Sequence, residues 1–225
     1  MTTIGVLTNV GSRHEPTPGI VHFLETTAFG STTNKDALQI SNLLQDWGGM
    51  SFANHNREQT LHCIDILRPN VHLGMGLLAD VLLQRNFADS EEEFYNALDA
   101  LAFQAQERVP RLLLAEALQV AAYGSDQQLG KLHFATPETL PLLSPQLVES
   151  FYNHSIRNNP QNMVVAGAGI SHDTLVDLAN DHFGHVAQKS APTTVPTVYR
   201  GGSHPISRLQ ESSIFSPTIP EEDFC

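Results

Sequence analysis

Basic residues are scarce in this chain of 225 residues. It carries 12 lysines and arginines against 24 aspartates and glutamates, a formal net charge of −12. Because nucleic-acid binding is dominated by neutralisation of phosphates, this balance predicts no nucleic-acid partner. An acidic surface attracts positively charged ligands, so the charge is compatible with a cationic peptide partner and equally with a surface that simply aids solubility.

Cysteines and long apolar runs are also rare. The two cysteines, Cys63 and Cys225, form no disulfide framework, so we expect a buried thiol at Cys63 and a reducing compartment. No apolar run reaches the roughly 18 residues needed to cross a bilayer, which predicts no direct membrane span. No basic residue precedes Arg13, so we expect any targeting segment to have been removed or to lie outside this chain.

The most informative stretch is Gly-Ile-Val-His-Phe-Leu-Glu-Thr at residues 19–26. A helix with the pattern His-x-x-Glu-His can place two imidazoles on one zinc ion while its glutamate activates the bound water. His22 and Glu25 occupy their positions, but Thr26 stands where the second histidine belongs. One histidine cannot hold a catalytic zinc ion, so the sequence predicts no metal, no cofactor and no peptidase activity.

The other histidines offer no replacement ligand set. His182 and His185 stand three residues apart at an expected helix end, where cationic side chains are favoured by the helix dipole. His55 and His62 lie in or beside expected strands, and we interpret them as packing or surface residues.

Hydrophobic spacing and capping signals predict strands interspersed with helices. Strands are expected over residues 4–10, 50–54, 60–67 and 163–170, of which 60–67 is apolar on both faces and 163–170 is buried. Helices are expected over residues 20–29, 35–47 with Asn34 as N-cap, 68–83, 90–108 with a capping box that starts at Ser90, 112–122, 144–156 with Ser144 as N-cap, and 171–183. Weak strand candidates follow at 193–199 and 213–215.

This order of elements predicts an α+β fold with a mixed, mostly antiparallel sheet backed by helices. We expect residues 1–187 to form one domain. Residues 188–225, rich in Ser, Thr and Pro, are expected to form a final strand and an interdomain linker.

Several segments carry a resemblance to a known family. They are Gly11-Ser12-Arg13, the run Gly19 to Glu25, Ala28-Phe29, Gly48-Gly49, and Asn162 to Gly167. In this order they resemble the inverted-zincin (pitrilysin-type) metallopeptidases over about residues 4–186. Among these, the chain is most similar to the N-terminal half of the alpha subunit of mitochondrial processing peptidase and of the core proteins of respiratory complex III.

The resemblance implies that the zinc site is degenerate. In active members a later helix supplies a glutamate as the third zinc ligand, and the family's spacing, counted from Thr26, leads to Ala102. Residues 100–106 contain no carboxylate. Thr26 and Ala102 are thus expected to be lost ligand positions, and His22 and Glu25 to be vestigial.

The resemblance also implies a function. We expect a non-catalytic alpha-type subunit that serves as a structural core subunit of complex III, on the matrix side of the mitochondrial inner membrane. The alternative is the presequence-recognition subunit of a processing-peptidase heterodimer, whose beta-type partner carries the zinc. Expected partners are that beta-type subunit, a separately encoded C-terminal half, complex III subunits and cationic presequences.

Overall fold

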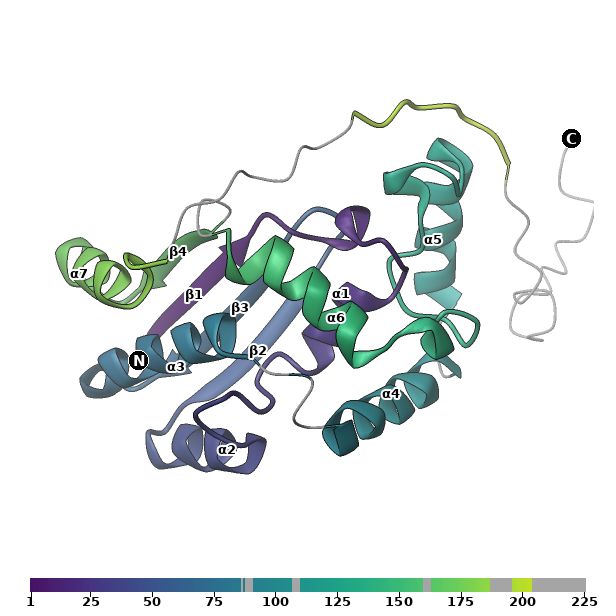
Figure 1. Cartoon of the computed structure of the whole chain (residues 1–225). Coiled ribbons are helices and arrows are strands. Elements are labelled where there is room, and N and C mark those ends of the chain that lie inside the picture. Colours follow the sequence, from purple (N-terminus) through teal and green to yellow (C-terminus); the bar gives the residue numbers. More distant parts are fainter. Residues whose placement is uncertain (86, 88–90, 107–109, 160–162, 187–195, 204–225) are drawn as a thin grey trace, which may run out of the picture.

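The computed structural model describes residues 1–85, 87, 91–106, 110–159, 163–186 and 196–203. Within this part of the chain, four strands form one open sheet against which helices pack (Figure 1). The three strand pairings are all antiparallel. The architecture is α+β, as the sequence predicts.

The sheet has the strand order β2-β3-β1-β4. Its strands are β1 (Thr2–Thr8), β2 (Met50–His55), β3 (Thr60–Ile66) and β4 (Met163–Ala168). The antiparallel register places Gly5 opposite Cys63 of β3 and Ala166 of β4. β2 and β4 are therefore the edge strands of the described sheet. Each strand lies within two residues of its predicted bounds.

The α-helices also follow the predicted order. In the described part of the chain they are α1 (Ile20–Thr26), α2 (Ala37–Asp46), α3 (Val71–Leu83), α4 (Glu91–Gln106), α5 (Pro110–Tyr123), α6 (Pro145–Tyr152) and α7 (His172–Phe183). A π-helical turn, Asn153–Arg157, extends α6. Short 3-10 turns occur at Ser12–His14, Arg68–Asn70, Gln128–Gly130 and Leu140–Leu142. None of the helices described combines the length and apolar character needed to cross a membrane.

The helices cover one face of the sheet. Successive strand side chains point to opposite faces, and Ile4, Val6, Ile64 and Ile66 on one face are fully buried. On the other face Met50, Phe52 and Val164 are 63, 45 and 59% exposed. One prediction is therefore wrong: the strand at 163–170 is an edge strand of the described sheet rather than a buried one. An apolar run cannot distinguish a central strand from an edge strand.

Side-chain caps explain where several helices begin. Ser144 accepts a hydrogen bond from the Leu147 amide at 3.3 Å, which confirms the predicted N-cap of α6. The predicted cap at Asn34 is wrong, because Asp36 accepts from the Gln39 amide at 2.7 Å and starts α2 instead. The Asn34 side chain instead donates to the Asp80 carboxylate at 2.6 Å and joins this loop to α3.

The segment 196–203 forms no strand, contrary to the expectation for 193–199. It contacts the C-terminal end of α5, where the Arg200 amide donates to the Ala122 carbonyl at 2.8 Å. Residues 193–195 and 213–215, the cap expected at Ser90 and the thiol of Cys225 lie outside the described residues. Cys63 is buried and free, as predicted.

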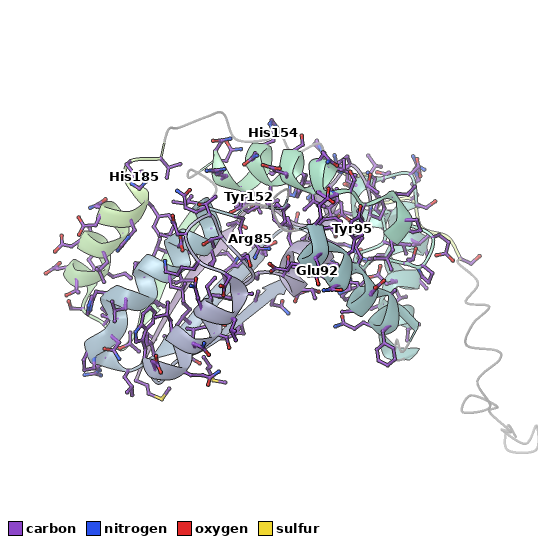
Figure 2. The ribbon with its side chains drawn as sticks, turned by 60° about the horizontal axis from the view of Figure 1, so that its bottom comes forward. Arg85, Glu92, Tyr95, Tyr152, His154 and His185 are labelled. Atoms are coloured by element: carbon purple, nitrogen blue, oxygen red, sulfur yellow. The ribbon has the colours of Figure 1, made fainter. Side chains whose placement is uncertain are left out.

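Polar side chains enter the core between α3 and α6. Figure 2 places Arg85 and Tyr152 within the body of the molecule, whereas His154 and His185 stand at its surface. The Arg85 guanidinium lies 4.9 Å from the centre of the Phe87 ring, and the Tyr152 hydroxyl donates to the Val81 carbonyl at 3.4 Å. Burial raises the pKa of Tyr152 and lowers that of Arg85.

Candidate functional site

Helix α1, which carries the sequence motif, is held at its N-terminus by a buried carboxyl group. Glu15 is 2% exposed and accepts hydrogen bonds from the amides of Gly19, at 2.9 Å, and Val21, at 2.8 Å. Burial raises the pKa of Glu15 to about 8, although the amide donors favour the ionised form and by themselves would lower the pKa. Gly19, with φ of 105°, adopts the left-handed conformation that lets the chain turn into the helix.

The C-terminal end of α1 is held by a cation. Arg85 donates to the carbonyl of Thr27, the residue at which the helix ends. The guanidinium at the C-terminal end matches the helix dipole, whereas Glu15 holds the N-terminal end through its hydrogen bonds to the first amides. A helix of 7 residues is thereby fixed in place by tertiary contacts.

His22 points from α1 into the protein and is 8% exposed. Its Nδ1 accepts a hydrogen bond from the Ala135 amide at 3.3 Å, and its ring centre lies 5.1 Å from that of Phe134 in an edge-on arrangement. Both partners belong to the loop between α5 and α6. One nitrogen of the expected zinc ligand is therefore occupied by the backbone of the protein itself.

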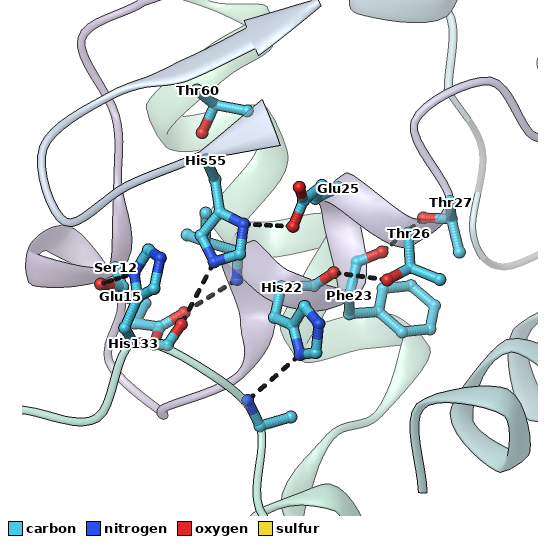
Figure 3. A network of polar contacts seen from close by, with 12 residues as sticks. Ser12, Glu15, His22, Phe23, Glu25, Thr26, Thr27, His55, Thr60 and His133 are labelled. Atoms are coloured by element: carbon cyan, nitrogen blue, oxygen red, sulfur yellow. Dashed lines mark hydrogen bonds and ion pairs between the residues drawn. The ribbon is translucent and has the colours of Figure 1, made fainter. Parts of the chain in front are cut away.

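Glu25 is paired with a histidine of the edge strand β2. Its carboxylate contacts Nδ1 of His55, while Nε2 of His55 lies 3.2 Å from the His133 carbonyl (Figure 3). Both nitrogens of His55 thus face oxygen atoms of the protein, the Glu25 carboxylate on one side and the His133 carbonyl on the other. The His55 side chain is 1% exposed and that of Glu25 is 22% exposed, so this is a largely buried ion pair.

A third histidine extends the network toward α5. The His133 ring centre lies 4.2 Å from that of His55, and its Nδ1 is 3.2 Å from the Ser12 hydroxyl. Burial and then the neighbouring charges of His55, Arg57 and His22 lower the pKa of His133 to about 3, so this ring is neutral. The His133 amide donates to Glu116 at 2.7 Å.

Thr26 does not replace the missing histidine. Its hydroxyl donates to the His22 carbonyl at 3.0 Å, a bond made within the helix. Thr26 lines an open cleft of about 590 Å³ between α1, β2 and α4, whose other lining residues include Glu25, Phe52 and Glu93.

The helix expected to supply the third ligand lies beside α1, as the resemblance implies. α4 packs against α1, but Ala102 is partly buried against the hydrophobic core. Ala102 does not line the cleft. Ala97 and Ala100, which precede it on the same helix, do. At the position that the resemblance implies, α4 thus offers a methyl group, and Glu93, the α4 carboxylate that lines the cleft, accepts a hydrogen bond from the Ser31 amide at 3.0 Å.

The residues of this site do not fit a zinc ion. A catalytic zinc site requires three protein ligands with a position left for water. Here one nitrogen of His22 and the carboxylate of Glu25 already have protein partners, and Thr26 and Ala102 provide no nitrogen or carboxylate. Among the described residues, no three His, Cys, Asp or Glu side chains are grouped so that they could hold a metal ion.

Sequence reasoning located His22, Glu25 and Thr26 correctly on one helix and missed the residues that surround them. His55 was interpreted as a packing or surface residue, and Glu15, His133 and Phe134 were not singled out. The only local signal was the position of Glu15, four residues before a glycine that begins a helix.

The fold and the motif together define a class: an α+β domain of the inverted-zincin type, with the motif helix packed against the sheet. The sequence model of the insulinase family, peptidase family M16, matches residues 1–131. This chain belongs to that family.

Individual relatives agree with the assignment. The chain is 30% identical over 235 aligned positions to the mitochondrial-processing peptidase subunit alpha of Homo sapiens, which covers 97% of this chain and 43% of that protein. It is 33% identical over 187 positions to an uncharacterized zinc protease of Mycobacterium tuberculosis, covering 81% of this chain and 42% of that protein. A protease from Helicobacter pylori has the same fold, with a TM-score of 0.78 at 23% identity over 88% of this chain and 49% of that one.

The chain spans less than half of the length of these relatives. The match to the alpha subunit and to zinc proteases supports the resemblance seen in the sequence.

Proposed function

We propose that this chain is a non-catalytic, alpha-type subunit that acts together with a zinc-bearing, beta-type partner. The observation that carries the proposal is that His22 and Glu25 already have partners within the protein. The Ala135 amide donates to His22, and His55 pairs with Glu25. A glutamate whose carboxylate is already bonded to His55 is not available to activate a water molecule. The relatives named as alpha subunits of the mitochondrial processing peptidase support a location in the mitochondrial matrix.

The cleft beside α1 supports peptide binding as the role of such a subunit. Its wall includes residues 51–53 of β2, an edge strand of the described sheet. An edge strand has unpaired backbone groups that can accept an extended peptide as an additional strand. Glu25 and Glu93 also line the cleft, and carboxylates favour a cationic peptide such as a presequence.

A structural role in complex III is the second candidate. The exposed side chains of Met50, Phe52 and Val164 on the uncovered sheet face favour it, because such surfaces are normally covered by a partner. A separately encoded C-terminal half would be one such partner. The names of the relatives support the processing-peptidase role, whereas the reading of the sequence favours the core role.

The test is purification of the native assembly from mitochondria, followed by identification of its subunits. The processing role predicts a beta-type partner with an intact His-x-x-Glu-His helix, and a soluble pair that cleaves presequence peptides. Cytochromes b and c1 in the assembly would instead support the core role. Recovery of the chain alone, with zinc and peptidase activity, would overturn both proposals.

The reconstituted pair allows a sharper comparison. Glu25→Gln in this chain should leave the cleavage rate at saturating presequence unchanged, because the glutamate that activates water belongs to the partner; the loss of a carboxylate from the cleft should affect only the KM. The matched substitution of the glutamate in the partner's motif should lower the rate by about 10²–10⁴-fold, the usual contribution of a general base. A comparable loss from Glu25→Gln in a correctly folded chain would contradict the non-catalytic role.

A further inference from the structure

The segment 196–203, referred to as the strap, crosses the surface from the 3-10 turn after β1 to the C-terminal end of α5 (Figure 1). At the first of these points, the Arg13 guanidinium donates to the Thr197 hydroxyl at 3.5 Å. At the second, the Arg200 amide donates to the Ala122 carbonyl at 2.8 Å. The strap therefore connects two elements that are far apart along the chain.

Hydrogen bonds rather than apolar contacts hold the strap in place. Gln127, just after α5, donates from Nε2 to the Val198 carbonyl at 2.9 Å and accepts at Oε1 from the Val198 amide at 2.8 Å. Arg200 forms an ion pair with Asp126 at 2.8 Å. Val198 and Tyr199 nevertheless remain 66 and 72% exposed. A segment that buries so little apolar surface opens at low free energy, while the rest of the fold stays intact.

The two elements that the strap connects also hold the loop that carries His133. On the α5 side, the buried Glu116 carboxylate accepts a hydrogen bond from the His133 amide at 2.7 Å. On the other side, the hydroxyl of Ser12, the neighbour of Arg13, lies 3.2 Å from Nδ1 of His133. The strap thus closes a continuous series of contacts that runs through α5, this loop and the turn after β1.

We propose that the strap is a releasable restraint on the histidine network. While it is attached, it holds α5 in position, which keeps His133 against His55 and thereby keeps Glu25 paired. Its release lets α5 move, withdraws Glu116 from His133 and loosens the Glu25 carboxylate beside the cleft. Residues 188–225 are expected to form an interdomain linker, so displacement of an adjoining domain would release the strap. The inference does not depend on the proposed function, because it concerns contacts within this chain alone.

Two variants of the full chain detach the strap without altering the histidine network. Gly201→Pro removes an amide that donates to the Ala122 carbonyl at 3.1 Å, and proline cannot adopt the φ of 67° found there. Gln127→Ala removes both hydrogen bonds to Val198. Gln119→Ala, within α5, is the matched control. Circular dichroism and thermal melting of each variant show whether the overall fold is retained.

Amide hydrogen exchange measures whether detachment reaches the loop. In both detached variants the amides of residues 196–203 should exchange at least about tenfold faster, the effect of losing one or two ordinary hydrogen bonds. The amides of His133 and Ala135, which donate to side chains of α5 and α1, should exchange faster as well. The amides of the central strands β1 and β3 should be unaffected, and Gln119→Ala should resemble wild type throughout.

Histidine NMR spectra report on the network directly. In the detached variants the ring-nitrogen signals of His22, His55 and His133 should shift, because their hydrogen-bond partners move. The signals of His154 and His185, which stand at the surface, should stay in place and serve as internal controls (Figure 2).

The coupling should also act in the reverse direction, because energetic coupling is reciprocal. Glu116→Ala removes the acceptor of the His133 amide and should therefore make the strap easier to detach. Limited trypsin digestion with mass spectrometry should show faster cleavage after Arg200 in this variant than in Gln119→Ala.

Three outcomes would overturn the proposal. The first is faster exchange confined to the strap in both detached variants, and the second is an unchanged rate of cleavage after Arg200 in Glu116→Ala. The third is a global loss of fold in both detached variants, which would show that the strap does not open separately from the domain.

Discussion

Single ionisable side chains determine how α1 is held. Glu15 lies at its N-terminus, Arg85 at its C-terminus, and His55 pairs with Glu25 on its flank. Each of these groups is largely removed from water, so its protonation state affects the free energy of unfolding.

Glu15 should make the protein less stable as the pH rises. Its pKa is raised to about 8 in the folded state from the model value of 4.5, so the folded state holds the proton more tightly. The stability from this group is present below pH 4.5 and is lost as the pH rises through 8. We expect Glu15→Gln to remove this dependence, which is on the order of 5 kcal/mol in wild type.

Urea denaturation at several pH values between 4 and 9 provides the measurement. Glu149→Gln, a half-buried glutamate of α6, serves as the control and should retain the wild-type slope. A Glu15→Gln variant with that same slope would show that the carboxyl group is ionised throughout.

Glu25 and His55 should behave as an energetically coupled pair. Glu25→Gln or His55→Gln alone should lower the free energy of unfolding by about 1–3 kcal/mol, because each leaves a charged partner in a largely buried site. The double variant should cost less than the sum of the two. A double-mutant cycle at neutral pH measures the coupling, and additive losses would contradict the ion pair.

At the scale of the element, local sequence decides where the helices begin. α6 begins at Ser144-Pro145, a hydroxyl cap followed by a residue with fixed φ and no amide hydrogen. α7 begins in a similar way, with the Ser171 hydroxyl accepting from the Thr174 amide at 3.2 Å. Because capping uses neighbours three residues apart, it could be predicted from the sequence at both positions.

Removing the α6 cap should destabilise the protein measurably. We expect Ser144→Ala to lower the free energy of unfolding by about 1 kcal/mol, the usual cost of a lost side-chain cap. Ser150→Ala, at an exposed position within the same helix, should be neutral or slightly stabilising, because alanine has the higher helix propensity. Thermal denaturation of both variants gives the comparison, and equal melting temperatures would contradict the capping role.

Element bounds depend partly on distant residues and were predicted less well. The helix predicted over 20–29 ends at Thr26, where Arg85 contacts the carbonyl of the following residue. Likewise, the loop before α2 is held by Asp80 of α3, so Asn34 contacts that carboxylate and Asp36 becomes the cap. Arg85 and Asp80 are both too far away in the sequence to enter a prediction from local pattern.

At the scale of the whole molecule, the site joins elements that are far apart along the chain. α1, β2, the loop at 133–135 and α5 meet around three histidines (Figure 3). Restoring one zinc ligand therefore cannot restore the metal site. Three ligands are required, and the existing groups are already bonded to one another.

Thr26→His should bind well under one zinc ion per chain and remain inactive as a peptidase. The new imidazole would join His22, but Ala102 still supplies no third ligand and Glu25 remains paired with His55. Zinc content after dialysis, measured by atomic absorption, provides the test, with Thr27→His as the control for a histidine outside the motif. Stoichiometric zinc in the Thr26→His variant alone would contradict this account.

The sequence by itself determined the order of strands and helices, and it predicts that the zinc ligand set is incomplete. Both follow from local information: hydrophobic period and caps act over a few residues, and a threonine or alanine cannot supply an imidazole or carboxylate. Only the tertiary structure decided what His22 and Glu25 do instead. Their partners lie 113 and 30 residues away, and such contacts arise from the packing of α1 against the sheet and the α5–α6 loop, which no local pattern encodes.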